Sequence, residues 1–257
     1  MRKFTTLFLL SLFLCVLPGT VFADAKSDYE FQLSQYRRSY SEFTQLKRDY
    51  LLNPTLDNQQ KSIITAKQVL LSRDLSKAAY ARYMIDLINV NKTNYAPLQP
   101  IINRLLMAVD IFTASASLSQ SITTPSDLKK FSDSYLINTI SPDRSFYYGQ
   151  VAVKLSQLVR FQLEAQNILD TIYPKLPDPQ PIQLKARLDE FPVLAEDINQ
   201  RIAAIVKMII PEPEVEKSPV APEQYFTLII EKLTDIRSRQ SALVDQLVDI
   251  DINYAQL

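Results

Sequence analysis

Apolar residues recur along this chain at alternating intervals of three and four positions, the spacing that lines one face of an α-helix. The first stripe begins shortly after residue 24 and ends at Asn53-Pro54, where proline disfavours further helix. A broader stripe follows from about Asp57 to Val90 and predicts a helix that is buried on more than one side. The first stripe contains Tyr29, Leu33, Tyr36, Tyr40, Phe43, Lys47 and Tyr50.

The middle of the chain continues the same pattern. A third stripe predicts a helix from Leu98 to Ala116. The next helix begins at Pro125, because proline is tolerated in a first turn, and we expect it to be short and to end near Asn138. Pro142 then predicts a restart of the chain into a long helix that Pro174 closes.

Two further stripes predict the C-terminal helices. One runs from Leu184 to Ile209 and contains Pro192, where we expect a kink or a break. The other runs from about Pro222 to Tyr254. Proline-rich connectors precede both helices, so we expect one helical unit over 24–174 and a helical pair over 175–257 that either docks on it or forms a separate arm.

The lengths of these helices favour an all-α fold. Most are close to 30 residues, or roughly 45 Å at the standard rise per residue. Long helices of similar length with short connections favour antiparallel neighbours, so we expect an elongated bundle of about six helices packed as in a coiled coil. Glycine is almost absent, since only Gly19 and Gly149 occur, and this disfavours hairpins and phosphate-binding loops.

Residues 1–23 have the three parts of a secretion signal. Arg2 and Lys3 form a basic start, an apolar stretch runs from Phe4 to Leu17, and Val21-Phe22-Ala23 ends the segment with small or compact residues. We expect cleavage after Ala23 and export to the periplasm, the cell surface or the extracellular space. The alternative is retention as a membrane tether, which the polar residues within the segment disfavour.

Several kinds of chemistry are unavailable to the exported chain. The only cysteine is Cys15, inside the signal segment, and the chain contains no histidine. Thiol nucleophiles, imidazole-dependent triads and the usual zinc ligands are therefore missing. With no recognisable catalytic constellation, we expect no enzyme, no cofactor and no metal site.

Charge and hydropathy limit the kinds of partner that the chain can bind. The 28 basic and 28 acidic residues balance, and loss of Arg2 and Lys3 leaves the exported chain slightly acidic. We therefore expect no nucleic-acid binding, which needs a dense basic face. No second apolar run appears long and charge-free enough to span a membrane, so we expect no span after residue 23.

Three polar residues interrupt the apolar stripes: Lys47, Gln162 and Gln240. A glutamine within a helix interface can fix register and partner, whereas one at the edge keeps its amide in water. We favour the edge position for both glutamines, and we expect Lys47 to extend its ammonium group into solvent.

Three further features have two interpretations each. The aromatic residues of the first stripe either form a carbohydrate or peptide surface or pack against a neighbouring helix, and their strict spacing favours packing. Asn91-Lys92-Thr93 is a glycosylation sequon, a pattern so short that it also arises by chance. The segment 211–216, rich in Pro and Glu, is either an extended ligand or a stiff spacer, and we favour the spacer.

These patterns together favour an exported, non-enzymatic structural or protein-interaction module of the cell envelope or extracellular space, with a protein partner. One alternative is a periplasmic chaperone or envelope adaptor that holds a client with a helical arm. Another is a carboxylate-dependent hydrolase of an envelope polymer, which would require two facing carboxylates in a cleft.

Overall fold

The computed structural model describes residues 24–91, 95–210 and 222–255, all of them in helices, turns or short connections. The expected signal segment, 1–23, and the Pro-rich and Glu-rich stretch 211–221 lie outside the described residues. Within the described ranges there is no β-strand, so the prediction of an all-α fold is confirmed. The long helices are α2 (Ala25–Leu52), α3 (Leu56–Val90), α4 (Gln99–Ser119), α5 (Pro125–Ile172), α6 (Ile182–Ile209) and α7 (Pro222–Ile250).

Short helical turns complete the connections. The 3₁₀ helices η1 (Ala96–Leu98) and η2 (Tyr173–Lys175) precede α4 and follow α5, and a π-helical turn, η4 (Asp251–Ala255), extends α7. Thr55 caps α3 by accepting a hydrogen bond from the backbone of Asn58, and Thr124 forms a capping box with Asp127 at the start of α5. These caps fix the helix starts close to the positions that the sequence predicts.

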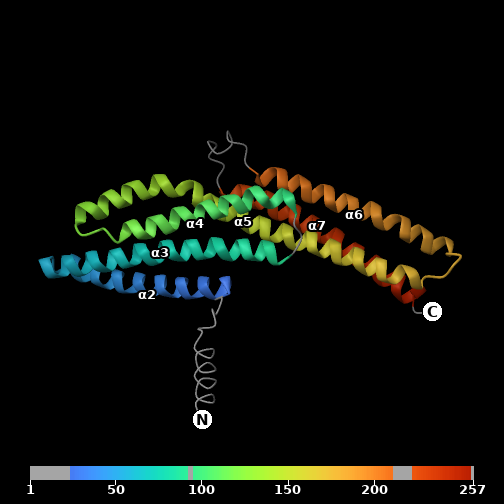
Figure 1. The fold of residues 1–257 in the computed structure, drawn as a ribbon, viewed down its shortest axis with the longest axis horizontal. Helices are drawn as coiled ribbons and strands as arrows, with labels where there is room; N and C mark the ends of the chain where they lie inside the picture. The colour runs from blue at the N-terminus through green and yellow to red at the C-terminus, as the bar shows by residue number, and fades with distance from the viewer. Residues whose placement is uncertain (1–23, 92–94, 211–221, 256–257) are drawn as a thin grey trace, which may run out of the picture.

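Successive helices run back and forth along the long axis of an elongated molecule (Figure 1). The chain passes antiparallel from α2 to α3, from α3 to α4 and from α4 to α5 in one half of the molecule. In the other half, α6 and α7 pack on the C-terminal part of α5 and on each other. The expectation of an elongated, mostly antiparallel bundle is confirmed.

The helix α5 links the two halves. It contains 48 residues, about 72 Å at the standard rise per residue. The main core cluster joins residues from five helices: Met84 of α3, Leu105 of α4, Leu155 of α5, Ile202 of α6 and Ile236 of α7 all belong to it. Apolar residues of α6 and α7 therefore share one buried cluster with α3, α4 and α5.

The predicted break at Pro142 is wrong, because α5 is continuous from Pro125 to Ile172. A proline within a helix loses one backbone hydrogen bond and disturbs the preceding turn. Tertiary packing overrides this cost: Tyr135 and Phe146, on either side of Pro142, both pack against the buried cluster of Ala78, Ala108 and Phe112. The break expected at Pro192 is also absent, since α6 continues through that residue from Ile182 to Ile209.

Gly149 lies where α5 approaches its neighbours most closely. A β-carbon added there would lie 2.9 Å from the Met84 sulfur and 3.1 Å from a Leu105 methyl carbon. Both neighbouring side chains are buried. Glycine is therefore present for close packing of α5 on α3 and α4, in a helical backbone that needs no positive φ.

Candidate functional site

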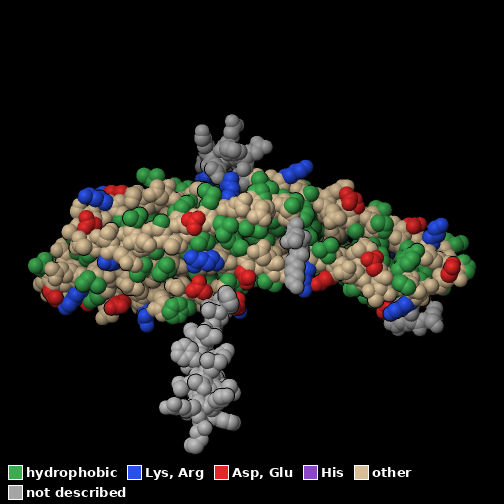
Figure 2. All heavy atoms as spheres, in the orientation of Figure 1, with side chains coloured by type: hydrophobic (Ala, Val, Ile, Leu, Met, Phe, Trp, Pro, Cys, Tyr) green, Lys and Arg blue, Asp and Glu red, His purple; other side chains and the backbone are tan. Residues whose placement is uncertain are grey.

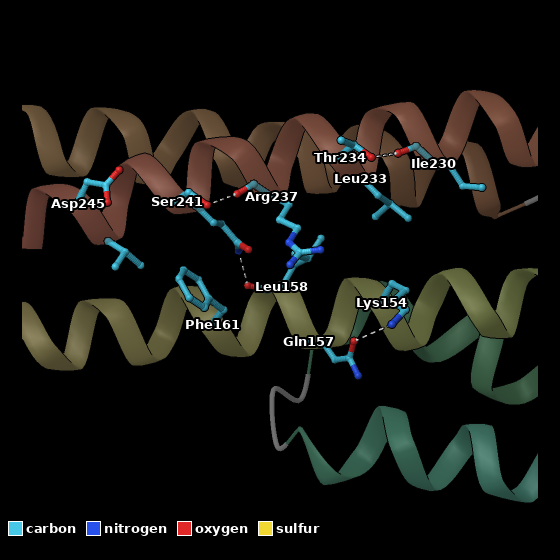
Figure 3. A pocket seen from close by; sticks show the side chains of 12 residues that line it. Lys154, Gln157, Leu158, Phe161, Ile230, Leu233, Thr234, Arg237, Ser241 and Asp245 are labelled. Atoms are coloured by element: carbon cyan, nitrogen blue, oxygen red, sulfur yellow. Dashed lines mark hydrogen bonds between the residues drawn. The ribbon is translucent and has the colours of Figure 1, made fainter.

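An apolar groove follows the line where α5 and α7 lie side by side. Its central hollow has a volume of about 690 Å³ and is lined from α5 by Leu158 and Phe161 and from α7 by Leu233 and Val244. Figure 3 shows Phe161 directed from α5 toward α7 and Leu233 directed back toward α5. The groove is open to solvent along the outer surface of the two helices, so a ligand would not need to displace any helix to reach it.

Two neighbouring hollows lengthen this groove. The one nearer the C-terminus, about 610 Å³, shares Phe161 and Val244 with the central hollow. The one nearer α3, about 340 Å³, shares Lys154, Ile230 and Leu233 with it. The three hollows therefore form one continuous surface, which we call the α5–α7 groove.

Large apolar side chains stand exposed on the walls of the α5–α7 groove. On α7 and η4, Ile230 is 57% exposed, Val248 is 49% exposed and Ile252 is 58% exposed. Ile168 of α5 is 49% exposed. A contiguous run of such residues is typical of a surface that binds another macromolecule, whereas single exposed apolar residues are common everywhere.

Buried glutamine amides hold the helices that form the groove. Gln240 Nε2 donates to the backbone carbonyl of Leu158 at 2.9 Å, and Gln240 is only 5% exposed. Gln162 Nε2 donates to the carbonyl of Ala195 at 3.1 Å, which joins α5 to α6. The expected edge position is wrong for Gln240, because its amide satisfies a backbone acceptor inside the interface instead of water.

Charge is distributed unevenly along the α5–α7 groove. Lys154 and Arg237 line the half nearer α3. Asp245 of the central hollow and Glu164 and Asp251 of the next one line the other half. The groove thus has a basic end and an acidic end, whereas on the face of the molecule shown in Figure 2 basic and acidic side chains are interspersed.

A second cluster of polar side chains is buried between α3, α4 and α5. The Asp74 side chain is fully buried and accepts hydrogen bonds from three neighbours. Arg73 Nε donates to it at 2.8 Å, Ser115 Oγ at 2.6 Å and the Tyr135 hydroxyl at 3.1 Å. The guanidinium of Arg73 also lies 3.6 Å from the centre of the Tyr135 ring, a cation–π contact.

Lys77 extends this cluster to the surface. Its ammonium donates to Asp143 at 2.7 Å and to the Tyr135 hydroxyl at 3.2 Å. Burial raises the pKa of Tyr135 above its ordinary value, and the nearby Asp74 carboxylate raises it further. Since the Asp74 carboxylate is enclosed and hydrogen-bonded to protein donors, the cluster joins three helices and offers no open face to a substrate.

The Asp74 cluster was not predicted, because its members lie far apart in the sequence. Ser115 and Tyr135 are separated from Asp74 by 41 and 61 positions, so only the packing of α3, α4 and α5 brings them together. Its one sequence-level sign is an aspartate within the broad apolar face of α3. No group of three or more metal-ligating side chains occurs among the residues that the structure describes.

The other residues singled out in the sequence lie apart from the groove. Tyr29 of α2 packs on α3, with its ring centre 5.0 Å from that of Tyr80, but Tyr40 is 54% exposed, so the aromatic stripe is only partly a packing seam. Lys47 is exposed, as expected. Asn91 caps α3, and its amide donates to the Ser156 hydroxyl at 2.6 Å; the other two sequon residues lie outside the described ranges.

One described helix has the length and composition of a membrane span, although the sequence pattern predicted no such helix after residue 23. The segment Ala96–Ser119 covers η1 and α4. Within it, a stretch of 18 residues has a mean hydropathy of 1.4, and 33% of that stretch is buried within the protein. Its buried residues face the core: Ile101, Leu105, Ala108 and Phe112 pack against α3 and α5. Core packing therefore accounts for only part of this apolar composition, since Met107 is 62% exposed and Leu118 is 63% exposed.

Comparison of the chain with models of protein families, with curated proteins and with solved structures finds no match.

Proposed function

We propose that this chain is an exported, non-enzymatic helical protein that binds a protein partner through the α5–α7 groove. The observation that supports this proposal is the continuous groove, walled by exposed apolar side chains on two long parallel helices. Grooves of this shape take an amphipathic helix whose apolar face fills the space between the two walls. The export part of the proposal rests on the pattern of residues 1–23.

The walls are suited to binding because they are held rigidly. The inner face of α7 is anchored by Ile236, Leu243 and Ile250, which are almost fully buried. Hydrogen bonding of Gln240 to Leu158 fixes α7 against α5 at the middle of the groove. A preformed site loses less conformational entropy when a partner binds than one that must be ordered first.

A periplasmic chaperone or envelope adaptor remains a second candidate, because the same exposed apolar residues suit a client segment as well as a fixed partner. The two candidates differ in selectivity: a dedicated partner is one protein species, whereas chaperone clients are many. A carboxylate-dependent hydrolase has no specific support in the geometry. Glu164 of the groove already pairs with Arg160 at 2.7 Å.

The test is a charge placed in the groove of the full-length chain, in the cells that produce it. Val244→Asp puts a carboxylate on the wall, and Ala242→Asp puts the same charge on an exposed neighbour that does not line the groove. We expect chemical crosslinking of intact cells to give protein adducts with the wild type and with Ala242→Asp, and none with Val244→Asp. Equal adducts for all three would contradict the proposal.

Export is tested in the same cells by N-terminal sequencing of the chain recovered outside the cytoplasm. We expect the chain to begin at Asp24. A chain that begins at Met1 and remains in the cytoplasm would refute this part of the proposal, and it would leave the groove experiment valid.

A further inference from the structure

The outer face of α7 has a symmetric pattern of residues about Ser241. Arg237 and Asp245 lie at equal intervals before and after it, and Ile230 and Ile252 lie at larger equal intervals. All five residues are exposed and line the α5–α7 groove. Ile252 lines its C-terminal hollow, and the other four line the central hollow. Reversing the direction of α7 about Ser241 therefore exchanges Ile230 with Ile252 and Arg237 with Asp245.

The two charged residues of this pattern are available to a partner. In the part of the chain that the structure describes, the side chains of Arg237 and Asp245 form no ion pair. Lys154 of α5 adds a positive charge near Arg237, and Asp251 adds a negative charge beyond Asp245. A helix that lies in the groove with the opposite order of charges would place unlike charges opposite each other along its length.

We propose that the partner of the α5–α7 groove is a second copy of this chain, bound so that the two α7 helices run antiparallel about a two-fold axis near Ser241. This inference rests on the proposed function, because it names the protein that fills the same groove. A two-fold contact uses one patch twice, so the patch must be complementary to itself. Arg237 then faces Asp245 of the second copy, and Ile230 faces Ile252 of the second copy.

The size of the surface fits a weak, reversible dimer. From Ile230 to Ile252 the helix spans roughly 33 Å at the standard rise per residue. With a width of about 15 Å on each copy, the contact buries on the order of 1,000 Å² in total, the lower limit for a specific interface. We therefore expect a dissociation constant on the order of micromolar.

Charge reversal tests the arrangement of the two copies. Arg237→Asp places two acidic residues opposite each other twice in the dimer, and Asp245→Arg places two basic residues there. By sedimentation equilibrium of the chain as purified from the cells that produce it, we expect each single change to raise the dimer dissociation constant about tenfold or more. The double change Arg237→Asp with Asp245→Arg restores unlike pairs, so we expect a value within about threefold of the wild type.

A cysteine at the symmetry axis tests the register. In a chain with Cys15→Ser, Ser241→Cys supplies the only thiol, and we expect mild oxidation to link two copies through it. Ala242→Cys, exposed on the neighbouring residue but outside the groove, is the matched control and should link far more slowly.

The outcomes separate this inference from the proposed function. A wild-type chain that stays monomeric at about one hundred times the expected dissociation constant overturns the second copy as partner. So does a dimer that the charge reversals leave unchanged. If groove-dependent adducts in cells then contain a different protein, the proposed function stands without this inference; if there are no groove-dependent adducts at all, both fail.

Discussion

At the scale of single residues, Asp74 is expected to make a large contribution to stability. Its carboxylate is fully buried and holds donors from Arg73, Ser115 and Tyr135. Asp74→Ala leaves the partly buried Arg73 guanidinium without its carboxylate, and removal of one partner of a buried ion pair typically costs about 3–5 kcal/mol. We expect urea unfolding, followed by circular dichroism, to show a loss of this size.

The matched control for Asp74 is Asp133, whose side chain is 64% exposed and pairs with Lys129 at 2.7 Å. An exposed pair on one helix contributes about 0–1 kcal/mol. Asp133→Ala should therefore change the free energy of unfolding by less than about 1 kcal/mol. Equal losses for the two variants would show that the Asp74 cluster does not join α3, α4 and α5 in the way described.

Gly149 gives a prediction of the opposite kind, in which added atoms destabilise. Gly149→Val inserts a branched side chain where even a β-carbon would lie 2.9 Å from the Met84 sulfur. Overpacking of a filled core costs about 1–3 kcal/mol, more than the gain in helix propensity from replacing glycine. Thermal unfolding should show a lower midpoint for Gly149→Val, while Asn138→Val, exposed on the same helix, stays close to the wild type.

Asp197 makes stability dependent on pH. Its carboxylate accepts hydrogen bonds from Arg201 at 3.0 Å and from Arg239 at 2.7 Å, and these contacts, chiefly that of Arg201, hold the pKa of Asp197 below its ordinary value. Because the pKa is lower in the folded than in the unfolded chain, the stabilisation is present above the unfolded pKa and is lost as the pH falls through the folded value.

The test compares wild type with Asp197→Asn in urea unfolding between about pH 7 and about pH 2. The wild type should be the more stable at neutral pH, and the difference should shrink once the pH falls below about 4. A difference that is constant over the whole range would show that the ion pairs of Asp197 do not contribute.

At the scale of the helices, stripe periodicity predicted the helical segments, although it divided α5 into two, because the side that faces the core is set by residues close together in sequence. The start at Pro125 was predicted because proline is tolerated in a first turn, and the structure adds the Thr124 capping box there and the Thr55 cap at the start of α3. The wrong prediction of a break at Pro142 has the opposite origin, in contacts between residues far apart in the sequence. The helix persists there because residues of α3 and α4, far away in sequence, hold both of its halves.

Pro192 offers a prediction at this scale, because it is exposed and lies inside the continuous helix α6. Pro192→Ala restores a backbone donor and removes a ring clash without loss of core packing. We expect a gain in the free energy of unfolding of about 1–2 kcal/mol, after allowance for the greater freedom of the unfolded chain. A loss of stability would mean that the proline supports the local course of α6.

At the scale of the whole molecule, the elongated all-α architecture was predictable and the candidate site was not. Helix length and the shortage of glycine are sequence properties, so they indicated the bundle directly. The α5–α7 groove depends on how closely two helices pack, and α5 and α7 lie far apart in sequence. In the sequence, Gln240 was recognised only as a polar residue within an apolar stripe. That it holds α7 against α5 follows from its hydrogen bond to the Leu158 carbonyl.

The central claim is that a protein contacts the α5–α7 groove, and site-specific photocrosslinking tests it most directly. A photoreactive phenylalanine analogue replaces Val244 on the groove wall, and in a parallel chain it replaces Ala242 next to it. In illuminated producing cells, we predict a protein adduct from position 244 and none from position 242. No adduct from 244, or equal adducts from both positions, would contradict the account.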